Sequence, residues 1–161
     1  MGLTLQKEIV SKNPAATIAL GKRLGKTFQG GEVLGLIGEL GSGKTTFVKG
    51  IAAGLGIKGR EPVNSPSFVL MREYEGKIPL YHFDAHRLTE ASGLLRLEQE
   101  IGLEDYLFGK GVSVLEWANR IESLLPKDYL RIEFEYDDKH RRLTFKPIGK
   151  RYEKILSAFG R

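Results

Sequence analysis

The sequence contains no cysteine, which excludes disulfide bonds, thiolate metal sites and cysteine nucleophiles. It also lacks any apolar stretch close to the roughly 20 residues that a membrane-spanning helix needs. Residues 1–10 have none of the long apolar run of a secretory signal. We therefore expect a cytoplasmic protein that does not enter a membrane.

Acidic residues are outnumbered, 20 against 25 lysines and arginines, and the surplus is concentrated near the C-terminus. Residues 139–161 hold eight lysines or arginines and one acid, Glu153. This bias predicts either a solvated surface or a patch that binds an anion, such as nucleic acid or an acidic protein face. With 161 residues, 41% of them hydrophobic, the chain is expected to form a single domain over residues 1–161.

Apolar runs alternate with segments of helical periodicity, which predicts an α/β fold: a mixed sheet flanked by helices, with antiparallel additions. The stretch Gly-x4-Gly-Lys-Thr at residues 38–45 makes the expected sheet P-loop NTPase-like. Asn13-Pro14 is a helix start, since asparagine caps and proline fits the first turn. Helices are expected at residues 14–30, 45–55, 117–124 and 150–159. Strands are expected at residues 3–10, 32–37, 68–74, 78–83, 112–115, 129–136 and 142–145, the last two forming a hairpin.

Residues 38–45 read Gly-Glu-Leu-Gly-Ser-Gly-Lys-Thr and satisfy the Walker A pattern between an apolar strand and a helix. The glycines let the backbone curl, so that its N–H groups point at phosphate oxygens. The following helix adds free N–H donors and a partial positive charge of about half a unit. A glycine-rich turn that only joins strand to helix is the alternative, but a chance match with these flanks is uncommon.

The loop therefore predicts a site for a nucleoside triphosphate and magnesium. Lys44 is expected to contact the β- and γ-phosphates, the Thr45 hydroxyl to ligate Mg²⁺, and Thr46 to support the α-phosphate. The residues expected to bind the nucleotide through this loop are Glu39, Leu40, Gly41, Ser42, Gly43, Lys44, Thr45 and Thr46.

Two acids stand where a phosphate loop needs a carboxylate, at the ends of neighbouring strands. Asp84 follows Tyr81-His82-Phe83, and Glu116 follows Val114-Leu115. Each is a candidate to bind Mg²⁺ or to orient the attacking water, and each is alternatively an ordinary solvated acid. Ser65 and Ser67 lie in a proline-flanked loop, where a hydroxyl either senses the γ-phosphate or simply completes a turn.

Three further side chains adjoin these acids. His82 and His86 flank Asp84 at i−2 and i+2, which would place them on one face of a strand. That pattern suggests a transition-metal site, but the phosphate loop favours magnesium. Trp117, the single tryptophan, is either a core residue or a lid beside the nucleotide, and its position after Glu116 favours the lid.

Five blocks in this order identify a resemblance to the TsaE (YjeE-type) family over about residues 10–147. They are the Walker A block, Asn-Ser-Pro-Ser-Phe at 64–68, Leu-Tyr-His-Phe-Asp-Ala-His-Arg-Leu at 80–88, Gly-Leu-Glu-Asp-Tyr at 102–106, and Leu-Glu-Trp at 115–117. The resemblance implies a bacterial ATPase that serves N6-threonylcarbamoyladenosine (t6A) formation at adenosine 37 of tRNA. It further implies that the protein acts with TsaB and TsaD and resets their complex between turnovers.

The resemblance also implies roles for residues. Lys44 and Thr45 bind ATP and Mg²⁺, while Asp84 and Glu116 serve the metal and the attacking water. Ser67 supplies the switch hydroxyl, where threonine is usual, and Trp117 is the aromatic beside the site. Residues 13–17 lie near the adenine, and an arginine of the late hairpin approaches the nucleotide, for which Arg142 is expected. Ala85-His86 replaces a more usual leucine-tyrosine pair.

Two other functions remain open. A small P-loop kinase would need an arginine-rich lid, for which Arg87, Arg96 and Arg120 are too scattered. A nucleotide-dependent binding module with incidental hydrolysis would use the basic C-terminal region to grip tRNA or the partner complex. A GTPase is disfavoured because the sequence has no Asn-Lys-x-Asp guanine motif.

Overall fold

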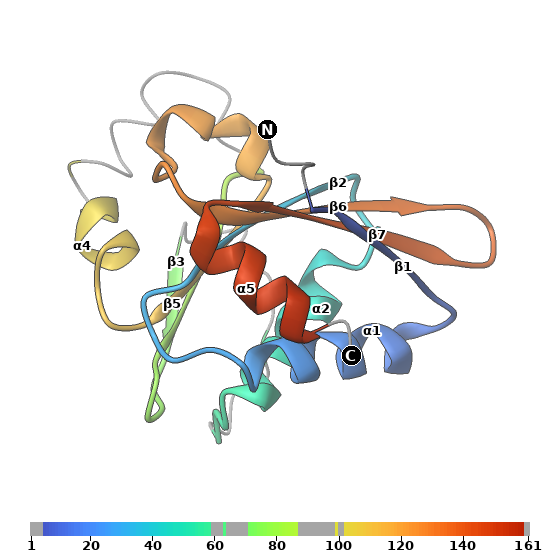
Figure 1. Cartoon of the computed structure of the whole chain (residues 1–161), viewed down its shortest axis with the longest axis horizontal. Helices are drawn as coiled ribbons and strands as arrows, with labels where there is room; N and C mark the ends of the chain where they lie inside the picture. The colour runs from blue at the N-terminus through green and yellow to red at the C-terminus, as the bar shows by residue number, and fades with distance from the viewer. Residues whose placement is uncertain (1–4, 59–62, 64–70, 87–98, 100–101, 160–161) are drawn as a thin grey trace.

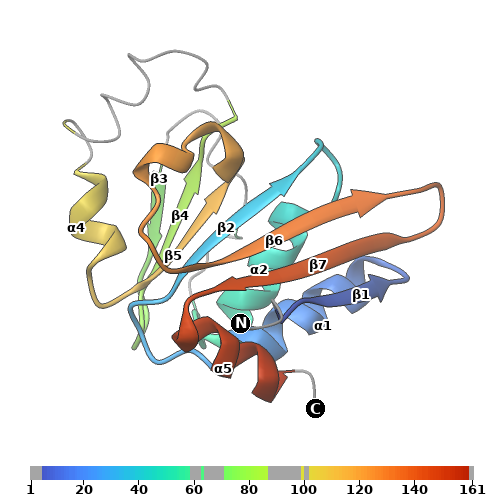
Figure 2. The same ribbon diagram turned by 45° about the horizontal axis from the view of Figure 1, so that its top comes forward.

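The computed structural model describes residues 5–58, 63, 71–86, 99 and 102–159. These residues form a seven-stranded sheet in the order β1-β7-β6-β2-β5-β4-β3 (Figure 2). The strands are β1 (Lys7–Ser11), β2 (Val33–Gly38), β3 (Met71–Tyr74), β4 (Leu80–Asp84), β5 (Val112–Glu116), β6 (Tyr129–Tyr136) and β7 (Arg141–Ile148). The helices are α1 (Pro14–Gly25), α2 (Lys44–Gly54), α4 (Leu103–Leu107) and α5 (Lys150–Phe159).

The centre of the sheet is parallel and its two sides are antiparallel. Strand β2 pairs in parallel with both β5 and β6, and β5 pairs in parallel with β4. The pairs β3–β4, β6–β7 and β1–β7 are antiparallel. This confirms the predicted α/β fold with antiparallel additions. The parallel strands β2, β4 and β5 end at one edge of the sheet, where ligands of open α/β sheets usually bind.

Each face of the sheet is covered by its own apolar layer. Helices α1, α2 and α5 pack on one face, through side chains such as Leu24, Phe47 and Leu156. On the other face, α4 and the 117–125 segment pack against Phe83 and Leu115. Figure 1 shows α1, α2 and α5 together on one side of the sheet. Each large apolar side chain buried in this way contributes about 1.5–3 kcal/mol to stability.

Helices α1 and α2 approach so closely that a side chain cannot fit between them. A Cβ on Gly50 would lie 2.1 Å from the Ile18 carbonyl oxygen, and one on Gly21 would lie 2.3 Å from that of Phe47. The start of α1 is fixed by Asn13, whose side chain accepts a hydrogen bond from the Ala16 N–H at 2.8 Å. This close packing brings the first turn of α1 beside the first turn of α2.

Several expected boundaries differ from the structure. Helix α1 ends at Gly25 rather than near residue 30, and the Thr27 hydroxyl donates to the Leu24 carbonyl just beyond that end. The 117–124 segment forms two 3₁₀ turns, Ala118–Arg120 and Glu122–Leu124, rather than one helix. The predicted hairpin is confirmed as β6–β7, and α5 has the predicted bounds. No helix in the described ranges is long and apolar enough to cross a membrane.

Candidate functional site

The glycine-rich loop joins the end of β2 to the start of α2. Gly43 caps α2 with φ of 106°, a left-handed conformation that favours glycine. A Cβ on Gly38 would lie 2.7 Å from the Phe134 carbonyl oxygen, so this position also excludes a side chain. The first turn of α2 contains no acid, and its N–H groups carry the partial positive charge of a helix start. The backbone of the loop thus has the conformation and the free N–H groups that can bind an anion.

Lys44, at the first position of α2, is 4% exposed. Its ammonium donates hydrogen bonds to the carbonyl oxygens of Gly38 and Glu39, the latter at 3.0 Å. Burial lowers the pKa of Lys44, opposed by the nearby carboxylates of Glu116, Asp84 and Glu39. Both hydrogen-bond acceptors of the ammonium are neutral carbonyl oxygens. If negatively charged phosphate oxygens took their place, the ammonium would be attracted to them more strongly.

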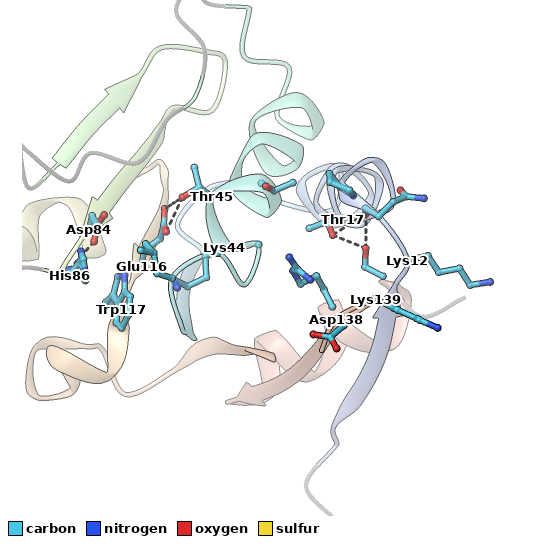
Figure 3. A pocket seen from close by; sticks show the side chains of 18 residues that line it. Lys12, Thr17, Lys44, Thr45, Asp84, His86, Glu116, Trp117, Asp138 and Lys139 are labelled. Carbon is cyan, nitrogen blue, oxygen red and sulfur yellow. Dashed lines mark hydrogen bonds between the residues drawn. The ribbon is translucent and has the colours of Figure 1, made fainter. Parts of the chain in front are cut away.

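The two predicted acids end adjacent strands and lie side by side. Asp84 of β4 is in register with Glu116 of β5, and both are nearly buried. The Thr45 hydroxyl lies 3.0 Å from each carboxylate oxygen of Glu116 and donates to that carboxylate. Asp84 accepts a hydrogen bond from the His86 backbone N–H at 2.8 Å. The structure therefore brings together the hydroxyl and both acids that the sequence predicted (Figure 3).

Trp117 follows Glu116 in a left-handed backbone conformation, with φ of 61°. That turn directs its ring over the loop, where the Lys44 ammonium lies 4.3 Å from the ring centroid. His86 stacks on the same indole, with ring centroids 4.7 Å apart and planes inclined by 24°. Both Trp117 and His86 line the cavity in front of the loop. Trp117 also packs against the second core cluster, and its role as a lid over a nucleotide stays a prediction.

The two histidines beside Asp84 are in different surroundings. His82 is fully buried, and its Nε2 lies 2.5 Å from Oε2 of Glu116. His86 lies beyond the end of β4, on the cavity wall. The sequence analysis missed the contact between His82 and Glu116. Only the neighbourhood of β4 and β5, which no local pattern reveals, brings the two side chains together.

A cavity of about 620 Å³ opens in front of the loop, within the usual size range of small-molecule sites. Figure 3 shows Asp84, Glu116 and Trp117 on one side of it, and Thr17 and Asp138 on the other. The loop residues on its wall are Leu40, Gly41, Gly43, Lys44, Thr45 and Thr46. The opposite wall is formed by the turn between β1 and α1 and by the tip of the β6–β7 hairpin, through Ser11, Lys12, Asn13, Pro14, Thr17, Asp138, Lys139 and Arg141.

Some of the residues predicted to bind the nucleotide do not line this cavity. Glu39 and Ser42 belong to the loop but do not line the cavity, and Ser42 is fully buried. Arg142 lines a second cavity of about 370 Å³. It also forms an ion pair with Glu8 at 3.1 Å. The hairpin arginine on the wall of the main cavity is its neighbour Arg141, and contact of Arg142 with the nucleotide stays a prediction.

The two serines of the proline-flanked loop, Ser65 and Ser67, lie outside the described residues, so the predicted switch hydroxyl stays a prediction.

Comparison with known proteins gives a consistent result. Residues 11–144 match the family described as "Threonylcarbamoyl adenosine biosynthesis protein TsaE". The chain is 42% identical over 151 residues to the tRNA threonylcarbamoyladenosine biosynthesis protein TsaE of Bacillus subtilis, spanning 92% of this chain and 90% of that protein. It is 38% identical over 136 residues to the protein of the same name from Treponema pallidum, spanning 84% and 96%.

The likeness extends to three dimensions. The crystal structure of YdiB from Bacillus subtilis matches the fold with a TM-score of 0.83 and 36% sequence identity. The match covers 99% of this chain and 97% of that one. Agreement over most of the length, in sequence and in fold, shows that this chain belongs to the TsaE family.

Proposed function

We propose that this chain binds and hydrolyses ATP in support of tRNA t6A formation, acting with TsaB and TsaD. The TsaE family serves threonylcarbamoyladenosine biosynthesis, as the names of its members state. The observation that carries the ATPase part is the convergence of Lys44, Thr45 and Glu116 at the start of α2, facing a cavity of nucleotide size. In this role the hydrolysis resets the TsaB–TsaD complex between turnovers.

The phosphates of ATP would bind to the loop backbone and to the ammonium of Lys44. Mg²⁺ would supply positive charge that neutralises the phosphates. Thr45 with Asp84 or Glu116 would hold that ion, and the other acid would orient the attacking water. The water oxygen would bond to the γ-phosphorus as the bond from that phosphorus to the β–γ bridging oxygen breaks. The electron pair of that bond would leave with ADP, and the proton of the water would pass to the released phosphate. The residues of the β1–α1 turn, which line the same cavity, would contact the nucleoside.

The metal and the nucleotide are expected to bind together. Among the described residues, no group of three or more histidine, aspartate or glutamate side chains is arranged to hold a metal ion. Mg²⁺ characteristically takes one or two carboxylates, several waters and phosphate oxygens. Titration of the protein with Mg²⁺ alone should therefore release little heat, whereas titration with Mg-ATP should give a saturable signal.

A reconstituted modification assay tests the whole proposal. The protein is combined with TsaB, TsaD, tRNA, ATP and threonylcarbamoyl-adenylate, and both ATP turnover and repeated tRNA modification are measured. We expect slow hydrolysis by the chain alone and strong stimulation by the partners. Rapid phosphoryl transfer to a small metabolite would instead indicate a kinase.

A Glu116→Ala variant tests whether repeated modification needs hydrolysis. It should support one round of modification at most, because one of the two acids at the reaction centre is missing. Glu122→Ala is the matched control, since Glu122 is 57% exposed and pairs with Arg131 away from the cavity. Normal repeated modification by Glu116→Ala would show that the chain acts as a binding module with incidental hydrolysis.

A further inference from the structure

A fully buried histidine lies in the sheet beneath the site. His82 is fully buried on the face of β4 that also carries Leu80 and Asp84, because side chains two residues apart share a face. Leu80 and Val114, its neighbours on that face, belong to the apolar layer under α2. A polar ring in such surroundings is unfavourable unless it has a hydrogen-bond partner.

That partner is Glu116. In the β4–β5 register His82 lies opposite Val114, so Glu116 is its diagonal neighbour on the same face, within reach of a long side chain. Oε2 of Glu116 lies 2.5 Å from Nε2 of His82 and 3.0 Å from the Thr45 hydroxyl. The carboxylate is thus held from two directions, by the sheet through His82 and by α2 through Thr45.

The direction of the hydrogen bond follows from the other ring nitrogen. Nδ1 of His82 has no hydrogen-bond partner among the described residues. A proton on Nδ1 would be a buried donor without an acceptor, so the favoured tautomer carries its proton on Nε2. The ring therefore donates its Nε2–H to the Glu116 carboxylate.

We propose that His82 is a positioning residue, which fixes the carboxylate of Glu116 in the orientation required for ATP hydrolysis. This inference rests on the proposed ATPase function. His82 does not line the cavity, so it would touch neither the nucleotide nor the water. Its effect is to restrict rotation of a carboxylate whose direction decides whether the reaction proceeds.

The position of His82 predicts which kinetic constant changes. The loop backbone and Lys44 bind the phosphates without contact to His82, so ATP affinity should be preserved. In a His82→Leu variant, the Glu116 carboxylate loses its donor from the sheet. Partner-stimulated kcat should fall about 10–100-fold, the range seen when such supporting hydrogen bonds are removed, while the Kd for Mg-ATP stays within about threefold.

Recovery of kcat by a glutamine variant distinguishes a role of His82 in positioning Glu116 from a role in packing alone. His82→Gln places an amide N–H the same number of bonds from the backbone as Nε2, so it should recover a large part of kcat. His82→Leu fills the site with an apolar group and should not, even where its thermal unfolding matches that of the wild type. Ser113→Ala is the control, since Ser113 is a fully buried polar residue of β5 away from the cavity.

Four proteins are measured side by side: wild type, His82→Leu, His82→Gln and Ser113→Ala. Unfolding midpoint, Mg-ATP Kd and kcat with TsaB, TsaD and tRNA are determined for each. Equal kcat in wild type and His82→Leu would overturn the inference, as would equal losses in the leucine and glutamine variants. If His82→Leu does not fold, a glutamine variant with wild-type Kd and kcat reduced as far as that of Glu116→Ala would also overturn it. Absence of hydrolysis in the wild type would refute the ATPase proposal itself.

Discussion

The ammonium of Lys44 lies 4.3 Å from the centroid of the Trp117 ring, which makes the loop lysine and the single tryptophan a cation–π pair. The same ammonium donates to the carbonyl oxygens of Gly38 and Glu39. The cation is therefore in contact with neutral partners within the chain. Nucleotide binding would exchange these contacts for contacts with phosphate oxygens.

Because of this pair, the fluorescence emission of Trp117 should respond to ligand binding at the glycine-rich loop. Addition of Mg-ATP should change the emission of Trp117 with a saturable dependence, because the cation beside the ring moves and the cavity fills. A Trp117→Phe protein lacks tryptophan and should give no such signal. Calorimetry that detects Mg-ATP binding without any change in emission would contradict the predicted place of Trp117 beside the nucleotide.

Removal of the lysine should weaken nucleotide binding strongly. Each charge-assisted hydrogen bond to phosphate is worth about 1.5–3 kcal/mol, so Lys44→Ala should raise the Kd for Mg-ATP by at least tenfold. Lys49→Ala, at an exposed position of the same helix, is the control and should leave the Kd unchanged. Calorimetric titration gives both values. Unchanged ATP affinity and hydrolysis in Lys44→Ala would refute the assignment of the phosphate loop.

The contact between α1 and α2 reverses the usual effect of a helical glycine. Glycine to alanine normally stabilises a helix by about 0.5–1 kcal/mol. At Gly50, however, the added Cβ would lie 2.1 Å from the Ile18 carbonyl oxygen, so Gly50→Ala should destabilise the protein by about 1–3 kcal/mol. Ala53→Gly, at an exposed position of α2, should cost only about 0.5–1 kcal/mol. Urea unfolding measures both, and a stabilising Gly50→Ala would show that the helices separate readily.

The lowered pKa of Glu133 is expected to make the stability of the fold depend on pH. Partial burial raises its pKa, but hydrogen bonds from Lys146 and Arg131 outweigh burial, and the net pKa is lowered. A carboxyl with a lowered pKa in the folded state stabilises the protein above the unfolded-state pKa of about 4.3, and this stabilisation is lost as pH falls through the folded-state value.

Glu133→Gln should therefore reduce the free energy of unfolding at neutral pH by about 1 kcal/mol or less, the usual range for half-exposed pairs. The difference from wild type should shrink as the pH is lowered below about 4. Glu153→Gln, at an exposed site of α5, is the control. A difference that stays constant over the whole pH range would mean that the ion pairs do not cause the effect.

The basic C-terminal region is divided by the fold into two groups. Arg141 and Arg142 begin β7, whereas Lys150 and Arg151 begin α5, at the other end of that strand. If the hairpin end binds tRNA, Arg141→Ala/Arg142→Ala should weaken tRNA binding and reduce its salt dependence by about one unit of slope for each lost phosphate contact. Lys150→Ala/Arg151→Ala should then have little effect. If both double variants bind tRNA as the wild type does, these four residues do not bind tRNA and form only a solvated surface.

The sequence was sufficient where structure depends on local pattern. The glycine-rich loop and the helix that follows it require only a few residues in a row. Asp84 and Glu116 could be placed at strand ends because each directly follows a short apolar run. That the two acids lie side by side depends on the pairing of β4 with β5, which no local pattern reveals.

Contacts between elements could not be predicted in the same way. The hydrogen bond from His82 to Glu116 depends on the pairing of β4 with β5, which are separated in the sequence by α4. The choice between Arg141 and Arg142 depends on register, because a shift of one residue moves a side chain to the opposite face of a strand. In the hairpin, Arg141 lies opposite Tyr136, and Arg142 lies opposite Glu135.

Strand β1 pairs with the start of β7, with Ser11 opposite Arg141, so one wall of the cavity is assembled from opposite ends of the sequence. A nascent chain emerging from the ribosome acquires the phosphate loop long before it acquires that wall. Closing so long a loop of chain is entropically unfavourable and is offset only once β6 and β7 are present to pair. Tight nucleotide binding should thus begin only when synthesis of the hairpin is complete.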